Sequence, residues 1–216
     1  MQGNIVLCGF MGSGKTSVGR RLAKLLDREF VDLDQYIEEQ TGMTVSQIFA
    51  QEGEDGFRRR EAQAVAQVAP GNGRVIASGG GTVLFPQNVE LFHQGGSVIL
   101  YLDVPLAALQ ERLKNDKRRP LLQKPNRRQV IADLYAKRCP LYRAAADRVI
   151  DAGAPAIVVA KRIAALWQPE SGGGQPGGNG PQRKGPGRGK KNFLTKKHPR
   201  RKLKNGHPVP KKENAP

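Results

Sequence analysis

Short apolar runs alternate with longer stretches of helical period along the first 168 residues of the chain. The apolar runs predict five strands, at residues 4–8, 30–33, 74–77, 98–102 and 148–151. Helical patterns are found at residues 15–26, 35–41, 44–69, 86–94, 105–114, 126–145 and 154–167. Strands separated by helices need crossover connections, so we predict an α/β fold with a mainly parallel sheet and helices on both faces.

Residues 169–216 differ in composition from this domain at residues 1–168. They hold 10 glycines, 8 prolines and 13 lysines and arginines, against two acidic residues and one aromatic side chain, Phe193. Such a segment buries too little apolar surface to offset its ordering entropy, so we predict a disordered basic tail that carries most of the net charge of +17. Weak, nonspecific binding to nucleic acid or an anionic surface suits this charge. A solubilising extension without a partner fits the composition equally well.

Several classes of protein are excluded at this stage. No apolar run approaches the ~20 residues that span a bilayer, and the N-terminus lacks the pattern of a secretory signal. Cys8 and Cys139 are too few for a disulfide framework, and the three histidines have no ligand spacing. We therefore expect a cytoplasmic protein with two inert thiols and no metal site built from Cys or His.

The strongest motif reads Gly-Phe-Met-Gly-Ser-Gly-Lys-Thr at residues 9–16, directly after a strand and at the start of a helix. This matches G-x-x-x-x-G-K-[ST], in which backbone N–H groups surround a polyphosphate. Lys15 is expected to reach the β- and γ-phosphates and Thr16 to bind Mg²⁺. Nucleotide binding follows from this motif, but the reaction does not.

Two carboxylates, Asp32 and Asp34, follow at the predicted end of the second strand. Strand alternation would direct both to one side, at the sheet edge where ligands gather, so one carboxylate suits a metal shell and the other an acceptor hydroxyl. The alternative is a surface turn in which Asp34 caps the helix at 35–40.

Basic and glycine-rich segments complete the candidate site. Residues 57–61 read Phe-Arg-Arg-Arg-Glu, and Glu61 lies three positions after Arg58, where it can orient that arginine; a solvated face is the alternative for the run. The glycines at 79–81 suit an anionic or polyhydroxylated substrate, or form only a flexible loop. A lid at about 113–126 would carry an arginine over the transferring phosphate, unless that loop is passive.

Taken in order, these motifs resemble the shikimate kinase family, a nucleoside-monophosphate-kinase-like group of P-loop phosphotransferases, over residues 3–167. The resemblance rests on the phosphate loop, Asp-Leu-Asp at 32–34, Phe-Arg-Arg at 57–59, the glycines at 79–81, Arg-Pro-Leu-Leu at 119–122 and Arg-Cys-Pro-Leu-Tyr at 138–142. It implies a three-layer P-loop NTPase sandwich whose five-stranded parallel sheet has the order 2-3-1-4-5. It also implies ATP-dependent phosphorylation of a ring hydroxyl of shikimate, giving shikimate 3-phosphate and ADP in the biosynthesis of chorismate and aromatic amino acids, by a monomer with Mg²⁺.

The resemblance also implies roles for individual residues. Catalysis would use Lys15, Asp34 and Arg119, and Mg²⁺ would be held by Thr16 and, through water, Asp32. ATP would contact Gly12, Ser13, Gly14, Lys15, Thr16, Ser17, Arg112, Arg119 and Pro155. Shikimate would contact Asp34, Phe49, Phe57, Arg58, Gly79, Gly80, Gly81 and Arg138. Arg118 lies beside Arg119, which leaves open whether the two share the charge of the lid. The three successive arginines at 58–60 leave open which of them faces the site.

Two competing functions remain at this point. A related small-molecule kinase, such as a gluconate kinase or a nucleoside monophosphate kinase, would share the phosphate loop, although Arg58 and Arg138 beside three glycines argue against an uncharged or nucleotide acceptor. A polyanion-binding protein acting through the tail would not need the kinase site, but the domain has no recognisable nucleic-acid module.

Overall fold

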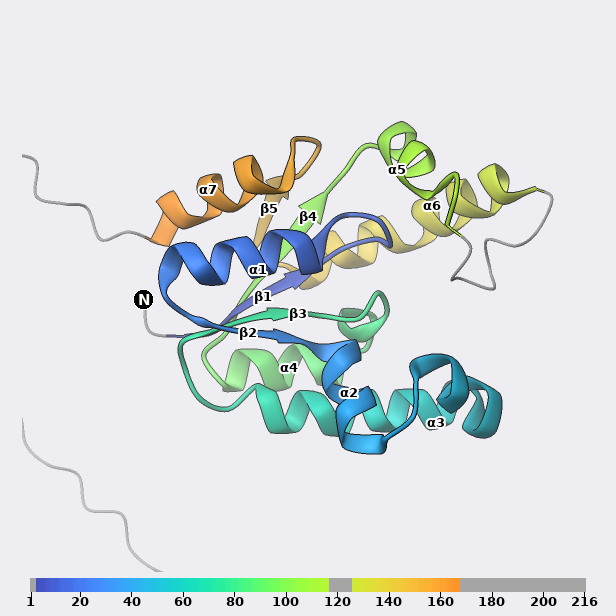
Figure 1. Cartoon of the computed structure of the whole chain (residues 1–216), viewed down its shortest axis with the longest axis horizontal. Helices are drawn as coiled ribbons and strands as arrows, with labels where there is room; N and C mark the ends of the chain where they lie inside the picture. The colour runs from blue at the N-terminus through green and yellow to red at the C-terminus, as the bar shows by residue number, and fades with distance from the viewer. Residues whose placement is uncertain (1–2, 117–125, 168–216) are drawn as a thin grey trace, which may run out of the picture. The chain divides into compact units, whose positions relative to one another are not determined.

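A computed structural model describes residues 3–116 and 126–167 of the chain (Figure 1). In these ranges five parallel strands form one sheet in the order β2-β3-β1-β4-β5. The strands are β1 (Ile5–Cys8), β2 (Glu29–Asp32), β3 (Arg74–Ala77), β4 (Val98–Asp103) and β5 (Arg148–Asp151). The predicted α/β class, parallel sheet and strand order are confirmed.

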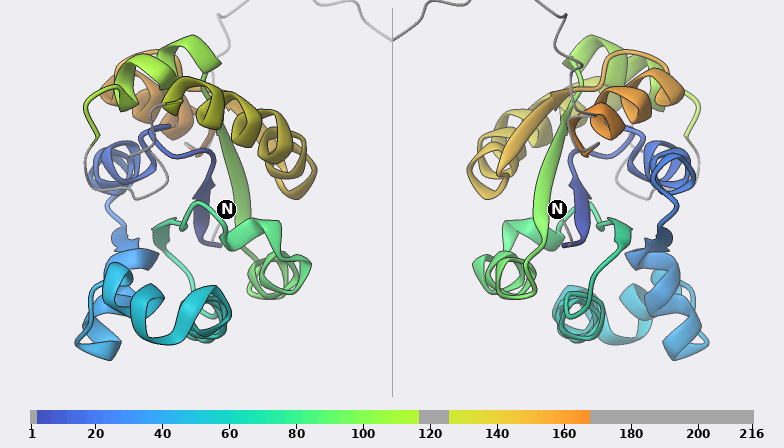
Figure 2. Two further views of the ribbon diagram at one scale, coloured as in Figure 1. Left: turned by 90° about the vertical axis from the view of Figure 1, so that its right-hand side faces the viewer. Right: turned by 90° about the vertical axis from the view of Figure 1, so that its left-hand side faces the viewer.

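Helices cover both faces of the sheet, as Figure 2 shows. They are α1 (Lys15–Leu26), α2 (Leu33–Thr41), α3 (Val45–Val68), the 3₁₀ turn η1 (Thr82–Leu84), α4 (Pro86–Gln94), α5 (Leu106–Leu113), α6 (Arg127–Ala145) and α7 (Ala156–Trp167). Helices α1 and α7 pack together on one face, and α4 and α6 cover the other, with α3 beside α4. Within the described ranges, no helix has the length and apolarity that a bilayer span requires.

The central strand β1 explains why the apolar pattern is continuous there. All four of its residues are completely buried, and Val6 is paired with Ile76 of β3 and Ile99 of β4. Burial raises the pKa of the Cys8 thiol to about 12, so this cysteine is a protonated core residue. Because the strands are parallel, their carboxyl ends meet at one edge, where the loops after β1, β2 and β3 converge.

Helix α3 shows how local sequence sets an element's start and its interruption. The N–H of Gln47 donates to the Thr44 hydroxyl (3.2 Å) and the N–H of Thr44 donates to the Gln47 side chain (2.8 Å), a reciprocal cap. Gly53 has φ 69° and ψ −170°, a conformation open to glycine, and it breaks the helix. An ion pair between Glu52 and Arg60 (2.9 Å) spans this break.

The prediction for the end of the second strand is wrong. Strand β2 stops at Asp32, and Leu33 begins α2, so Asp34 lies in the first turn of a helix and not on the strand. The turn from strand to helix, rather than strand alternation, therefore places the two carboxylates. Asp34 is not the cap either, because Asp32 occupies that position, without a side-chain capping bond.

Residues 117–125, which include Arg118 and Arg119 of the expected lid, lie outside the described residues, as does the predicted tail at 169–216.

Candidate active site

A cradle for an anion follows β1. Gly9, Gly12 and Gly14 have φ of 143°, 78° and 91°, which favours glycine. An added Cβ at Gly9 would also lie 2.9 Å from the carbonyl oxygen of Leu102 on β4, so a side chain would collide there. The loop leads directly into the N-terminus of α1, whose free N–H groups and dipole favour a phosphate.

Lys15 and Thr16, the first residues of α1, place their polar groups at this loop. The Lys15 ammonium donates to the carbonyls of Gly9 (2.8 Å) and Phe10 (3.2 Å). The Thr16 hydroxyl donates to the carboxylate of Asp32 (2.7 Å). A hydroxyl and a carboxylate are the hard oxygen donors that Mg²⁺ prefers beside a phosphate, so this pair fits the expected ion.

Asp34 brings the second carboxylate to the same cavity. Asp34 is solvent-exposed at the cleft. The surrounding protein nevertheless raises the pKa of its carboxyl to about 6, mainly by desolvation and then through the negative charge of Asp32. Lys15 acts in the opposite direction and lowers this pKa. A carboxylate with a pKa closer to neutrality is a better proton acceptor than an ordinary aspartate.

A buried carboxylate ties helix α3 to the loop after β3. Glu61 is completely buried and accepts hydrogen bonds from Arg58 (2.7 Å) and from the Thr82 hydroxyl (2.7 Å). The contact expected from the spacing of Arg58 and Glu61 is therefore present. Gly81 lies against the guanidinium, since an added Cβ would be 2.5 Å from a terminal nitrogen of Arg58. A side chain at residue 81 would therefore require the Arg58 guanidinium to move.

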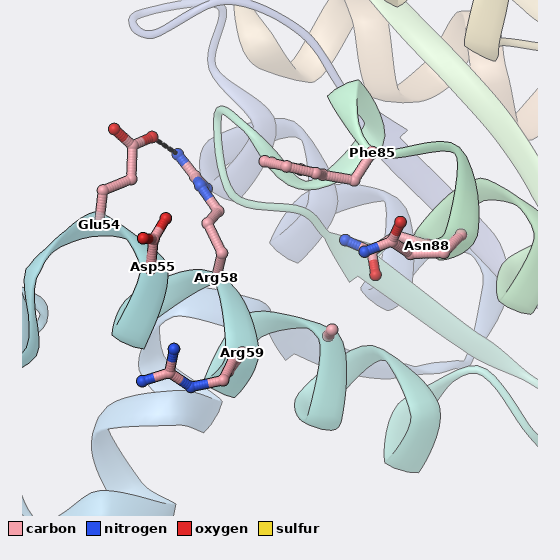
Figure 3. Close-up of a pocket in the computed structure, with 8 residues that line it drawn as sticks. Glu54, Asp55, Arg58, Arg59, Phe85 and Asn88 are labelled. Atoms are coloured by element: carbon pink, nitrogen blue, oxygen red, sulfur yellow. Dashed lines mark hydrogen bonds and ion pairs between the residues drawn. The ribbon is translucent and has the colours of Figure 1, made fainter.

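Two aromatic rings hold the Arg58 guanidinium. The ring centroids of Phe57 and Phe85 each lie 5.3 Å from its central carbon, within cation–π range. Figure 3 shows the guanidinium directed toward the carboxylate of Glu54 with Phe85 beside it. Arg58 and Phe85 line a cavity of about 430 Å³ between α3 and the start of α4.

The side chains of the other two arginines in the run at 58–60 point in other directions than Arg58. Arg59 projects away from Arg58 in Figure 3. Arg60 pairs with Glu52 across the break in α3. Arg58 is thus the one of the three that meets the glycine loop, as the positions of Phe57 and Glu61 in the sequence indicate.

Helix α6 approaches the same loop from the other side. Arg138 lines one cavity with Lys15, Asp34 and Gly80. Tyr142, one turn after Arg138, is completely buried, and its hydroxyl donates to the carbonyl of Gly80 (2.5 Å).

Two adjoining cavities gather most of the expected site residues. The first, of about 400 Å³, is lined by Gly12, Gly14, Lys15, Thr16, Ser17, Asp32, Asp34, Gly80, Arg112 and Arg138. The second, of about 310 Å³, is lined by Gly12, Ser13, Gly14, Ser17, Arg112 and Pro155. The phosphate loop borders both cavities, so a polyphosphate lying along it would reach from one to the other.

Some expected residues lie outside these two cavities. Phe49 is 39% exposed and stacks on the buried Phe57, with 4.7 Å between ring centroids. Gly79 packs closely against Asp34, since an added Cβ would be 2.9 Å from a carboxylate oxygen of that residue. Arg119 is not among the described residues.

The sequence analysis assigns no role to Tyr142 or Phe85. The four-residue spacing between Arg138 and Tyr142 places both on one face of a helix, and this spacing could have indicated Tyr142. Phe85 lies next to Arg58 because α4 packs on α3, and no local pattern in the sequence indicates that contact.

Comparisons with known proteins agree on one family. Residues 11–167 match the family described as Shikimate kinase. The chain is 47% identical over 171 residues to a shikimate kinase of Stenotrophomonas maltophilia strain R551-3, covering 76% of this chain and 94% of that one. It is 49% identical over 149 residues to a shikimate kinase of Aromatoleum aromaticum, covering 69% and 85%.

A solved structure is similar in fold as well as in sequence. The shikimate kinase from Acinetobacter baumannii in complex with shikimate superposes with a TM-score of 0.71 and 42% identity, over 76% of this chain and 92% of that one.

Proposed function

Because the chain belongs to the shikimate kinase family, we propose that it transfers the terminal phosphoryl group of ATP to a ring hydroxyl of shikimate, giving shikimate 3-phosphate and ADP. The observation that carries this proposal is the cavity shared by Lys15, Asp34, Gly80 and Arg138. It joins a cation for phosphate, a carboxylate for the acceptor hydroxyl and a cation for the substrate carboxylate. In this family the reaction belongs to the biosynthesis of chorismate and aromatic amino acids.

The nucleotide side uses the phosphate loop and α1. The N–H groups of residues 12–17 would bind the phosphates, and Lys15 would neutralise the charge that develops on the transferred group. Arg112 and Pro155 would flank the adenine, which their shared cavity supports. Arg119 is proposed as a second cation at the transferred group, from the sequence motif alone.

Thr16 and Asp32 would hold Mg²⁺, Asp32 through a water molecule. When bound, this ion supplies positive charge to the phosphate oxygens and so favours transfer. The hydrogen bond between the two side chains keeps both oxygen ligands at the phosphate loop.

The acceptor side uses α2, α3, α6 and the glycine loop. Asp34 would orient the attacking hydroxyl and accept its proton, and its raised pKa supports this role. Arg58 and Arg138 would bind the carboxylate of shikimate. Phe49 and Phe57 would form an apolar wall, and the peptides of residues 79–81 would contact the ring.

The test is ADP release from ATP and Mg²⁺ on addition of shikimate, measured beside two other acceptors. Gluconate carries a carboxylate on a linear polyol, and a nucleoside monophosphate carries a phosphate. Release with shikimate and not with the other two supports the proposal, and release with gluconate alone would replace it with the related kinase.

We also propose an accessory property for the tail, polyanion binding, based on its 13 basic residues against two acidic ones. We expect the enzyme to act as a monomer. It would act in the cytoplasm, with Cys8 and Cys139 as free thiols.

A further inference from the structure

The carbonyl groups of the glycine loop are held in two different ways. Those of Gly79 and Gly81 accept hydrogen bonds from donors within three residues, Ser78 and Thr82 for Gly79 and Leu84 for Gly81. The carbonyl of Gly80 accepts from Tyr142, which is 62 residues away on α6. Among these contacts, only the bond from Tyr142 comes from a distant part of the chain.

The bond from Tyr142 restrains Gly80, which lines the cavity with Asp34 and Arg138. An added Cβ there would meet no atom within 4 Å among the described residues, so no neighbouring group occupies that side of the residue. Glycine has the most freely rotating backbone, and a planar peptide moves as one unit with its carbonyl. The bond from Tyr142 therefore fixes the orientation of the peptide that carries the Gly80 carbonyl.

The packing of its ring holds the Tyr142 hydroxyl in place as a hydrogen-bond donor. Its ring is completely buried and stacks on Tyr101, with centroids 5.6 Å apart and an interplanar angle of 30°. Burial raises the pKa of Tyr142 to about 12, while the guanidinium of Arg138, acting as a charge and a hydrogen-bond donor, lowers it. The hydroxyl thus stays protonated at physiological pH, as a donor to the Gly80 carbonyl must be.

We propose that Tyr142 is a positioning residue for the acceptor substrate: its hydroxyl holds the Gly80 peptide in a fixed orientation at the cavity that Arg138 also lines. This inference rests on the proposed function, in which both groups contact shikimate. Glu61 makes the corresponding link on the opposite side, between Arg58 and Thr82 of the same loop. Loss of the Tyr142 hydroxyl should therefore weaken shikimate binding and leave nucleotide binding intact.

Tyr101 offers a matched control because it is the other half of the ring stack. It is 1% exposed, and its hydroxyl donates to Asp103 (3.0 Å) rather than to the glycine loop. Tyr101→Phe and Tyr142→Phe each remove one hydroxyl and keep the ring. A role of Tyr142 in packing alone would give both variants the same kinetics.

The experiment is steady-state kinetics of the full chain and both variants, with shikimate and ATP varied separately. Tyr142→Phe should raise the KM for shikimate about tenfold, the effect of losing a hydrogen bond to a substrate-binding group, and change the KM for ATP less than about twofold. Tyr101→Phe should change both constants less than about twofold. Calorimetric titration with shikimate in the absence of ATP should show the same loss of affinity for Tyr142→Phe.

Three outcomes would overturn the inference. The first is an unchanged KM for shikimate in Tyr142→Phe, and the second is an equal rise in Tyr101→Phe. The third is a Tyr142→Phe protein that fails to fold, because the fold and not the substrate site would then need the hydroxyl. Absence of shikimate-dependent turnover in the unaltered chain would instead defeat the proposed function, so the two failures are distinguishable.

Discussion

Glu61 and Arg58 form an ion pair of 2.7 Å in which the carboxylate side chain is 1% exposed and the guanidinium side chain 18% exposed. The same carboxylate accepts a hydrogen bond from the Thr82 hydroxyl, so a single buried group fixes both Arg58, a residue of the proposed substrate site, and the turn after the glycine loop. One orientation of Arg58 is thereby selected before any substrate binds.

Glu61→Gln should raise the KM for shikimate about tenfold and lower the free energy of unfolding by ~1–3 kcal/mol. The amide keeps the size of the side chain but leaves Arg58 without its buried counterion. Kinetics and urea unfolding measure the two effects. Glu54→Gln is the matched control, since Glu54 pairs with the same arginine but is 67% exposed, and its change should stay within ~1 kcal/mol. Equal effects of the two variants would contradict the importance assigned to Glu61.

Asp34→Asn should lower kcat by ~10²–10⁴-fold and leave the affinity for ATP nearly unchanged. The amide has the same shape but cannot accept the proton of the acceptor hydroxyl. Lys15→Met should instead weaken nucleotide binding. Turnover and a fluorescent nucleotide titration separate the two, and near-normal turnover by Asp34→Asn would show that another group receives the proton.

The pH dependence should follow the raised pKa of Asp34, about 6. Activity needs the carboxylate, so kcat/KM for shikimate should fall as the pH drops below about 6.

The charged form of Asp34 should lower the stability of the fold. Its pKa in the folded protein lies above its unfolded value of 3.8, which means that the fold disfavours the charged carboxylate. The Tm of Asp34→Asn should exceed that of the unaltered chain at pH 8, and this gain should vanish as the pH falls from 6 toward 3.8. A gain that is constant with pH would point to another cause.

Arg119→Ala should reduce kcat by ~10²–10³-fold, as expected when one group that stabilises transition-state charge is removed. Arg118→Ala tests whether the neighbouring arginine shares this role. If the charge is carried by Arg119 alone, Arg118→Ala should keep nearly full turnover. A larger loss in Arg118→Ala than in Arg119→Ala would reverse the assignment.

Truncation after Gln168 should leave shikimate turnover unchanged and abolish binding to single-stranded RNA. The binding of the full chain should weaken steeply between low and physiological salt, because counterion release supplies the affinity. Little base preference is expected, since Phe193 is the single aromatic residue of the tail. A salt titration of labelled RNA against both chains measures this. RNA binding retained after truncation would assign it to the domain, and lost turnover would make the tail part of the enzyme.

Local sequence is sufficient to predict the helices, the strands and the phosphate loop, because each of them depends on residues that are neighbours in the chain. The predicted helix at 15–26 and strand at 74–77 have the bounds observed for α1 and β3. The glycines at positions 9, 12 and 14 indicate a loop with positive φ angles, which other residues rarely adopt. The strand order followed only from the family resemblance, since apolar runs do not say which strands are neighbours.

Contacts between distant segments set which side chains meet. The sequence does not distinguish the three successive arginines, and the packing of α3 against the glycine loop selects Arg58. Local alternation misplaced Asp34 on a strand, because α2 begins at Leu33, two residues before the predicted helix. The bond from Tyr142 to Gly80 joins residues 62 positions apart. No local period encodes such a contact, because it depends on how α6 lies across the sheet.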